Sequence, residues 1–273
     1  ILKLSDEELV LCSNIPSLSH LGSLKERLSR HTVLDNSFPE LHKTNSEKKV
    51  RANIIDLIME RDLLDAYPYD SMDNLLELLR EAASHSKVKE IKISIYRMTS
   101  HPRIIEYLIK AANNGKRVRV LIELRARFDE ANNVDWAKKL KDSGCEVYYG
   151  TKRFKSHFKA CQIVFKKSFS KIGEQEIITQ VGTGNYNETT ARQYTDFSII
   201  TSSRRLGEEV STLFDNAIDG ITDNQFRYII TSPSCMRTKL IELIDRERIK
   251  GSKGRIFIKV NSLSDRHIVE KLS

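Results

Sequence analysis

The chain has 273 residues and a formal net charge of +8, with 40% hydrophobic and 30% charged residues, the composition of an ordinary globular protein. No apolar run approaches the roughly 20 residues that a membrane-spanning helix needs. None of the four cysteines forms a C-x-x-C pair, so neither a zinc ribbon nor a redox motif is expected. The positive charge suits a polyanion, although a solvated basic surface without a special partner would carry the same charge.

The first part of the chain gives little periodic signal. We interpret residues 1–48 as a connecting region, because Asn, Ser, Pro, His and charges occur there without a period. Residues 50–66 have the pattern of a short amphipathic helix. The segment 67–71 (Tyr-Pro-Tyr-Asp-Ser) breaks this helix, and Asp70 or Ser71 is expected to cap the leucine-rich helix that follows.

Strands and helices alternate through the middle of the chain. The first strands are predicted at residues 88–96, 118–124 and 145–149, with helices at residues 103–113 and 130–142 between them. The short connections of this βαβαβ pattern predict an α/β fold with a mostly parallel sheet flanked by helices. Further elements follow in the same manner: strands at residues 157–165, 177–181 and 196–201, and a helix at residues 204–219.

The alternation restarts after Gly220. Strands are predicted at residues 227–230 and 255–260, a helix at residues 234–249, and a last helix that Asp265 opens. We interpret this part as the start of a second, similar α/β domain that is incomplete here. Because the sequence begins at an isoleucine and ends inside an apolar-periodic run, we expect the chain to be a fragment of a longer protein.

The segment Lys155-Ser-His157-Phe-Lys159 is the most informative for chemistry. On a strand, alternate side chains share a face, so His157 and Lys159 are predicted to point the same way, with Cys161 behind them. A neutral imidazole is a competent nucleophile toward phosphorus, and a neighbouring ammonium can neutralise the oxygens that it attacks. Taken alone, the H-x-K pattern favours a structural histidine on a basic strand. A second copy, His85-Ser-Lys87, is interpreted as a surface loop.

Two other segments suggest phosphate binding. The run from Gly182 to Asn187 (Gly-Thr-Gly-Asn-Tyr-Asn) follows a strand, and its glycines let backbone N–H groups approach a phosphate, although a plain glycine-rich turn has the same pattern. Arg97 and Arg127 follow the first two strands of the alternating region, at the sheet end that faces the ligand crevice in open α/β folds. Two guanidiniums there would clamp phosphate oxygens, and a pair of surface arginines is the alternative.

Together these segments resemble polyphosphate kinase, whose catalytic core has a phospholipase D-like fold. The order and spacing agree from about residue 50 to the end. The motifs that carry the resemblance are Tyr67-Pro-Tyr-Asp-Ser71, Ile95-Tyr-Arg97, Glu123-Leu-Arg-Ala-Arg-Phe-Asp-Glu130, the His157-x-Lys159 strand, Gly182-Thr-Gly-Asn-Tyr-Asn-Glu188, Thr190-Ala-Arg192 and Tyr194-Thr-Asp196. The resemblance implies three parts: residues 1–48 as the tail of an upstream helical domain and linker, residues 49–222 as a first phospholipase D-like catalytic domain, and residues 223–273 as an incomplete second one.

The resemblance also implies a reaction and roles for residues. ATP would donate its γ-phosphate to His157, and the phosphohistidine would extend a polyphosphate chain reversibly. Arg97 and Arg127 fall on the magnesium–phosphate site; because a guanidinium cannot ligate a cation, both are expected to clamp the phosphates that carry Mg²⁺. Tyr194 falls on a nucleotide-contacting position. Lys159 is expected to act beside His157 in catalysis. Phosphate contacts are assigned to Lys159, Gly184 and Asn185.

The sequence departs from the family and superfamily patterns at informative positions. Phe158 stands where the family usually has Ala or Ser, and Val164 stands where phospholipase D motifs have Asp. The second argues against a straightforward phosphodiesterase. The family's second essential histidine and a nucleotide-binding arginine would lie beyond Ser273, so the chain alone is not expected to turn over.

Two alternatives to the kinase stay open: a phospholipase D-like phosphodiesterase and a non-catalytic polyanion-binding module. Stacking aromatics on a nucleic-acid platform are not evident, so nucleic acid is not an expected partner. The expected partners are ATP or ADP, polyphosphate and further copies of the chain, with Mg²⁺ accompanying the nucleotide. The expected location is the cytoplasm of a bacterial-type cell, with peripheral membrane association left open.

Overall fold

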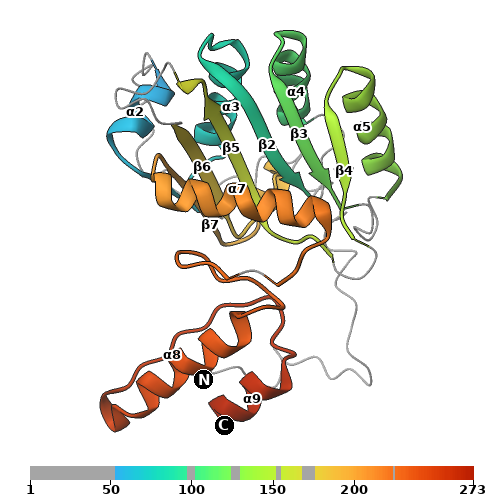
Figure 1. Cartoon of the computed structure of the whole chain (residues 1–273). Coiled ribbons are helices and arrows are strands. Elements are labelled where there is room, and N and C mark those ends of the chain that lie inside the picture. Colours follow the sequence, from blue (N-terminus) through green and yellow to red (C-terminus); the bar gives the residue numbers. More distant parts are fainter. Residues whose placement is uncertain (1–52, 97–101, 124–129, 152–154, 168–175, 224) are drawn as a thin grey trace, which may run out of the picture. The chain divides into compact units, whose positions relative to one another are not determined.

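The computed structural model describes residues 53–96, 102–123, 130–151, 155–167, 176–223 and 225–273. These residues form an α/β fold with one seven-stranded sheet in the order β1-β7-β6-β5-β2-β3-β4 (Figure 1). The strands are β1 Leu63–Tyr67, β2 Val88–Ile95, β3 Arg117–Ile122, β4 Glu146–Tyr149, β5 Lys159–Phe165, β6 Ile177–Gly182 and β7 Asp196–Thr201. The α-helices are α2 Ile54–Glu60, α3 Asp73–Ser84, α4 Arg103–Asn113, α5 Glu130–Asp142, α6 Glu188–Ala191, α7 Arg204–Asp219, α8 Met236–Arg248 and α9 Arg266–Leu272.

The sheet is mixed and mostly antiparallel, so the expectation of a mostly parallel sheet was wrong. Only β2–β3 and β3–β4 are parallel pairs among the described strands, and the helices α4 and α5 make their crossovers. All other neighbours run antiparallel. Antiparallel strands need no crossover helix, and β5, β6 and β7 follow one another without a long helix between them. The βαβαβ pattern therefore described only three of the seven strands, β2, β3 and β4.

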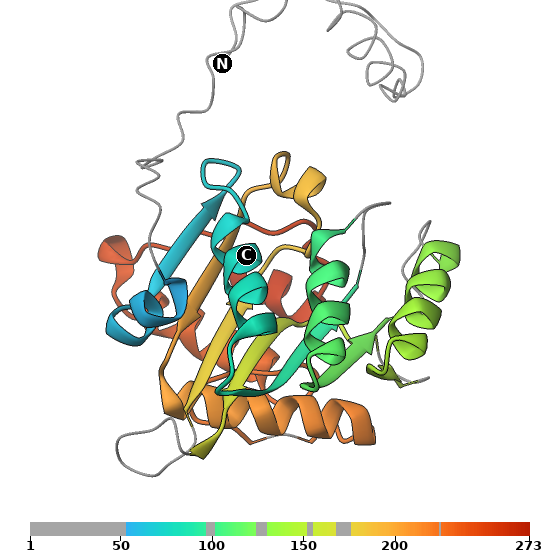
Figure 2. The same cartoon turned by 90° about the horizontal axis from the view of Figure 1, so that it is seen from above.

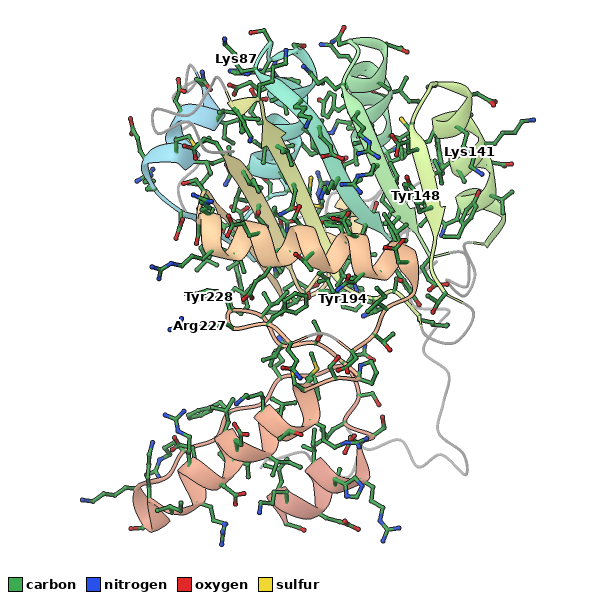
Figure 3. All side chains as sticks on the ribbon, viewed as in Figure 1. Lys87, Lys141, Tyr148, Tyr194, Arg227 and Tyr228 are labelled. Carbon is green, nitrogen blue, oxygen red and sulfur yellow. The ribbon has the colours of Figure 1, made fainter. Side chains whose placement is uncertain are left out.

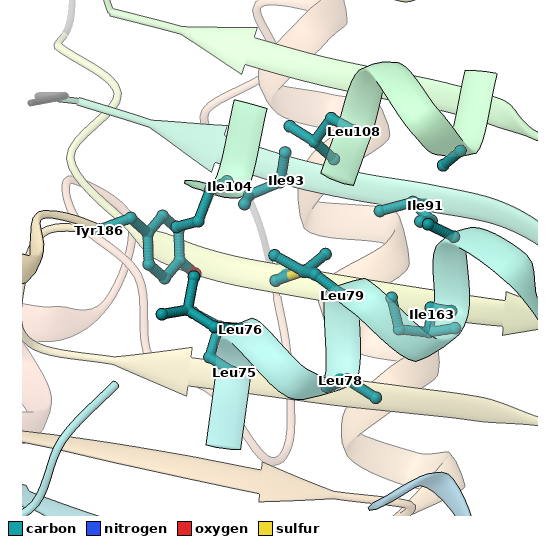
Figure 4. Packing of buried hydrophobic residues seen from close by; sticks show 14 of the residues in the cluster. Leu75, Leu76, Leu78, Leu79, Ile91, Ile93, Ile104, Leu108, Ile163 and Tyr186 are labelled. Atoms are coloured by element: carbon teal, nitrogen blue, oxygen red, sulfur yellow. The ribbon is translucent and has the colours of Figure 1, made fainter. Parts of the chain in front are cut away.

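Helices cover both faces of the sheet (Figures 1 and 2). On β2, the isoleucines 91, 93 and 95 belong to the main buried cluster together with leucines of α3 and α4 (Figure 4). The alternate positions of the same strand, Lys92 and Ser94, face α7, whose Val210 and Phe214 pack against Ala160 of β5. The period-2 alternation of the strands thus decides which helix each side chain meets.

A charged layer lies between the sheet and α7. Lys92 is only 3% exposed and donates a hydrogen bond to Ser211 Oγ at 2.6 Å. Arg119 pairs with Glu90 at 2.5 Å and with Asp215 of α7 at 2.7 Å. Buried charges are tolerated when they are paired in this way, which explains charged residues inside strands that are covered on both faces.

Residues 225–273 contain two α-helices, a short 3-10 helix (Gly251–Lys253) and no strand, so the predicted strands at 227–230 and 255–260 were wrong. Instead of pairing with a strand, the backbone N–H groups of Arg227, Tyr228 and Ile229 donate to the Glu209 carboxylate. In the second segment Phe257 is 92% exposed. A strand needs a neighbour for its backbone groups, and the described residues supply none here. The two helices were predicted correctly as α8 and α9.

Residues 50–71 also differ from the expectation. The described part of the predicted helix is shorter, as α2, and is followed by the unpredicted edge strand β1. Helix α3 begins at Asp73 after Met72, which makes no side-chain cap. Asp70 instead accepts a hydrogen bond from the backbone N–H of Ala66 at 2.8 Å and so closes the turn after β1.

Asp65 of β1 provides a stability prediction. The side chain is 3% exposed, only its Oδ1 has a partner, Asn74, and burial raises the pKa from 3.8 to about 6. The folded state holds the Asp65 proton more tightly than the unfolded state does. Protonated Asp65 therefore contributes stability to the fold that is fully present below about pH 4 and is lost as the pH rises through about 6. We therefore expect Asp65→Asn to raise the free energy of unfolding at pH 8 by about 1–3 kcal/mol.

Urea unfolding of both proteins at pH 5 and pH 8 tests this prediction. The difference between variant and wild type should grow with pH. A difference that is the same at both pH values would show that ionised Asp65 costs the fold nothing.

Candidate functional site

The sheet register gathers the predicted site residues at one edge. Ile95 pairs with Ile122, so β2 and β3 end side by side. Lys159, at the start of β5, pairs with Gly182 at the end of β6. Gly182 in turn pairs with Ser198, near the start of β7. The carboxyl ends of the parallel strands therefore meet the H-x-K segment and the glycine-rich turn at a single edge.

His157 and Lys159 are in direct contact. The Nζ of Lys159 lies 3.0 Å from Nδ1 and 3.1 Å from Nε2 of His157, and it donates to the main-chain oxygen of His157 at 2.7 Å. The strand begins at Lys159, two residues later than predicted, so His157 lies just before it and is exposed. Phe158, between them, packs edge-on against Phe214 of α7 with ring centroids 5.3 Å apart.

Lys159 carries its charge in a buried position. The residue is 5% exposed, and burial lowers the pKa of its ammonium to about 8, while Asp196 acts in the opposite direction. Cys161, two residues further along β5, belongs to the main buried cluster. The site thus presents an exposed imidazole beside an ammonium that is partly withdrawn from water.

Tyr96 contacts both members of the pair. Its ring meets the His157 ring edge-on with centroids 4.8 Å apart, and Lys159 Nζ lies 5.3 Å from the Tyr96 ring centroid. An ammonium over a tyrosine face is attracted by the ring quadrupole. Tyr96 therefore limits the orientations of the imidazole and favours the charged form of the lysine.

The glycine-rich turn is fastened to the start of β7. Thr183 donates through Oγ1 to Asp196 Oδ1 at 2.7 Å, and its N–H donates to the Phe197 oxygen at 3.0 Å. A Cβ on Gly184 would lie 2.8 Å from Asp196 Oδ2, so this position has no room for a side chain. Asn185 Oδ1 is buried without a hydrogen-bond partner. This unsatisfied amide oxygen is an acceptor, and a hydrogen-bond donor on a ligand could complete it.

The other predicted residues have separate outcomes. Tyr194 is 56% exposed and lies at the end of the sheet where β2, β3 and β4 finish (Figure 3). Arg97 and Arg127 lie outside the described residues. His85, in the second H-x-K copy, packs edge-on against Phe165 at the far end of β5, which separates it from this edge.

Sequence reasoning missed the roles of Asp196, Tyr96 and Glu123. All three stood inside quoted motifs, but their effect depends on contacts between strands distant in sequence. The one available signal was position, since each stands at or next to the end of a strand. Carboxylates in that location are candidates for contact with the site.

Comparison with known proteins identifies the family. The model of polyphosphate kinase C-terminal domain 1 matches residues 53–223, and that of polyphosphate kinase C-terminal domain 2 matches residues 229–273. The chain belongs to the polyphosphate kinase family. The polyphosphate kinase of Escherichia coli K12 is 38% identical over 90% of this chain and 36% of its own length. That of Staphylococcus epidermidis is 34% identical over 99% and 37%. The chain therefore spans about a third of these relatives.

A solved structure agrees with this assignment. The polyphosphate kinase of Porphyromonas gingivalis matches with a TM-score of 0.68 and 33% identity over 81% of this chain and 36% of that chain. Nuc of Salmonella typhimurium, a phospholipase D family member, matches with a TM-score of 0.45 and 16% identity over 58% of this chain and 93% of that chain. The second likeness is too weak to carry a conclusion about activity.

Proposed function

We propose that the full-length protein transfers the γ-phosphate of ATP reversibly to polyphosphate through a phosphohistidine at His157. The observation that carries the proposal is the contact between the exposed imidazole of His157 and the buried ammonium of Lys159. In this proposal the imidazole is the nucleophile, and the neighbouring ammonium neutralises the phosphoryl oxygens that the imidazole attacks. Family membership supplies the substrates to which this chemistry is assigned.

The reaction divides into two displacements at phosphorus. In the first, a ring nitrogen of His157 attacks the γ-phosphorus, a P–N bond forms, and the bond to the bridging oxygen breaks with its electron pair leaving on ADP. In the second, a terminal oxygen of polyphosphate attacks the phosphohistidine and the imidazole is released. Lys159 is proposed to neutralise the transferred oxygens, and the side-chain NH2 of Asn185 and the N–H groups beside Gly184 are proposed as neutral donors.

Mg²⁺ enters this account with the nucleotide. No group of three or more His, Cys, Asp or Glu side chains that could hold a metal ion occurs among the residues that the structure describes. We propose that substrate phosphates bring the cation. When bound, Mg²⁺ neutralises charge on the phosphates, and Arg97 and Arg127 are proposed to clamp those same oxygens.

The phosphodiesterase alternative finds less support. Val164 occupies the position of the phospholipase D aspartate, is 4% exposed, and pairs in mid-sheet with Glu90 and Ile177. A carboxylate is therefore absent at that motif position. The binding-module alternative would leave the contact between His157 and Lys159 without a use.

Arg127→Lys gives a prediction for the proposed clamp. A lysine keeps the positive charge but cannot reproduce two parallel hydrogen bonds to phosphate oxygens. We expect the variant of the full-length protein to lose about 10- to 100-fold in the rate of phosphoenzyme formation. A rate equal to that of the wild type, measured by rapid quench with γ-labelled ATP, would remove Arg127 from the site.

Product formation tests the function. The full-length protein should convert γ-labelled ATP and Mg²⁺ into labelled polyphosphate, and ADP with polyphosphate into ATP. Hydrolysis of a phosphodiester without either product would favour the phosphodiesterase, and salt-sensitive polyphosphate binding without turnover would favour the binding module. Assembly as a homo-oligomer in the bacterial cytoplasm belongs to the same proposal. Among the described residues no helix is long and apolar enough to cross a membrane.

A further inference from the structure

Glu123 is a buried carboxylate directly behind the site. It follows the last residue of β3 and is 2% exposed. Its Oε2 accepts a hydrogen bond at 2.9 Å from the backbone N–H of Ser156, the residue before His157. Hydrogen bonds to a carboxylate are about twice as strong as neutral ones. The Glu123 carboxylate thus holds the backbone next to His157, whose imidazole is exposed.

The backbone at Gly150 leaves room for this hydrogen bond. Gly150 follows β4, and a Cβ added there would lie 3.1 Å from Glu123 Oε2 and 3.0 Å from Ser156 Oγ. Both distances are shorter than ordinary van der Waals contact. A glycine therefore lets the carboxylate and Ser156 meet beside the end of β4.

The position of Glu123 is itself fixed. Its N–H donates to the oxygen of Ile95 at 3.0 Å, which continues the ladder between β2 and β3. Asn133 of α5 is fully buried. Its Nδ2 donates to the main-chain oxygens of Glu123 and Tyr96, both at 3.1 Å. Tyr96 is the residue whose ring meets the His157 imidazole. The Asn133 side chain therefore links Tyr96, which contacts the imidazole ring, to Glu123, which holds the backbone beside it.

A third buried side chain fixes the chain on the other side of His157. Ser94 of β2 donates through Oγ to the Phe158 oxygen at 2.7 Å and accepts from the Ala160 N–H at 3.1 Å. Residues 156–160 are thus held by β2 and β3 together. A reaction slows when a catalytic group is displaced by as little as about 1 Å. Side chains that hold the backbone beside His157 can therefore affect the reaction rate without touching the substrate.

We infer that Glu123 is a positioning residue for His157: it sets the distance between the imidazole and the transferred phosphoryl group through the N–H of Ser156. The inference rests on the proposed phosphohistidine function. It predicts that loss of the carboxylate slows phosphoryl transfer while ATP binding is kept, because the bond acts on the nucleophile and not on the nucleotide.

The test uses four variants of the full-length protein. Glu123→Ala removes the acceptor, and Glu123→Gln keeps an acceptor without the charge. Gly150→Ala keeps the carboxylate but crowds its bond to Ser156. Glu90→Ala is the matched control, since Glu90 is also a buried carboxylate, at 7% exposure, but pairs with Arg119 away from this edge. Single-turnover phosphoenzyme formation, ATP affinity and the folded fraction are measured for each.

Glu123→Ala should lower the single-turnover rate by about 10- to 100-fold with ATP affinity changed less than about 3-fold. Glu123→Gln should lie between alanine and wild type, and Gly150→Ala should also slow the step. Glu90→Ala should lose stability without this selective loss of rate. If Glu123→Ala does not fold, Gly150→Ala decides in its place.

Wild-type rates in the folded Glu123 and Gly150 variants would overturn the inference and leave the proposed function standing. Equal losses of rate in Glu90→Ala and Glu123→Ala would reduce Glu123 to a structural residue and would also overturn it. A wild-type protein that forms no phosphoenzyme would overturn the proposed function itself, and the inference with it.

Discussion

Replacing His157 by alanine is expected to abolish phosphoenzyme formation in the full-length protein. The imidazole is the exposed nucleophile of the proposed site. Without it the phosphoryl group has no acceptor on the protein, so both polyphosphate synthesis and the reverse reaction should fall to background. ATP binding should persist, because the proposed nucleotide contacts lie on other residues.

The chain supplies its own control for this experiment. His85→Ala removes the histidine of the second H-x-K copy, which packs against Phe165 at the opposite end of β5. This variant should keep full labelling, with at most a modest loss of stability from the missing ring contact. Loss of label in both variants, or in neither, would contradict the assignment of His157.

Replacing Lys159 by methionine is expected to give the second-largest loss. Methionine fills a similar volume but cannot stabilise charge on the phosphoryl oxygens, and loss of one such donor costs about 100- to 1,000-fold in rate. Lys159→Arg restores a positive charge with different geometry and should recover part of the rate. Lys166→Met is the matched control, because Lys166 is the residue that follows β5 at its other end.

The lowered pKa of Lys159 adds a pH signature to the same experiment. Around pH 8 half of the ammonium groups have lost their proton, so the wild-type rate of phosphoenzyme formation should fall as the pH rises through that value. The limb should vanish in Lys159→Met, which has no ammonium, and also in Lys159→Arg, because a guanidinium stays charged. An alkaline limb that survives in Lys159→Met would belong to another group.

Local patterns in the sequence predicted the elements with strong local signals. The helices at residues 103–113 and 204–219 and the strand at residues 196–201 match the structure residue for residue. Each has a clear period and, for the helices, a glycine at or just after the cap with a positive φ: Gly115 at 75° and Gly220 at 76°. Such signals depend only on neighbours in sequence.

Features set by distant residues could not be predicted in the same way. Strand direction in β5, β6 and β7 depends on which strands pair, and hydrophobic alternation is the same for both directions. β1 was missed because a buried aspartate interrupts its apolar pattern, and its pairing with β7 spans more than a hundred residues. The strand propensity of residues 255–260 is real, but a strand also needs a partner.

The candidate site shows the same division. The sequence motifs indicated His157, Lys159 and the glycine-rich turn, because each has a recognisable chemical pattern. Their meeting at one edge follows from the register of β5 with β6. The contributions of Asp196, Tyr96 and Glu123 follow from contacts across strands, which no local pattern contains.

The most direct test of the account is to locate the phosphoryl group on the protein. The full-length protein is incubated with γ-labelled ATP and Mg²⁺, the protein is separated under alkaline conditions, and the labelled peptide is sequenced by mass spectrometry. The account predicts label that is stable in base, labile in acid and located on His157. Acid-stable label, label on another residue, or no label on folded protein that binds ATP would contradict it.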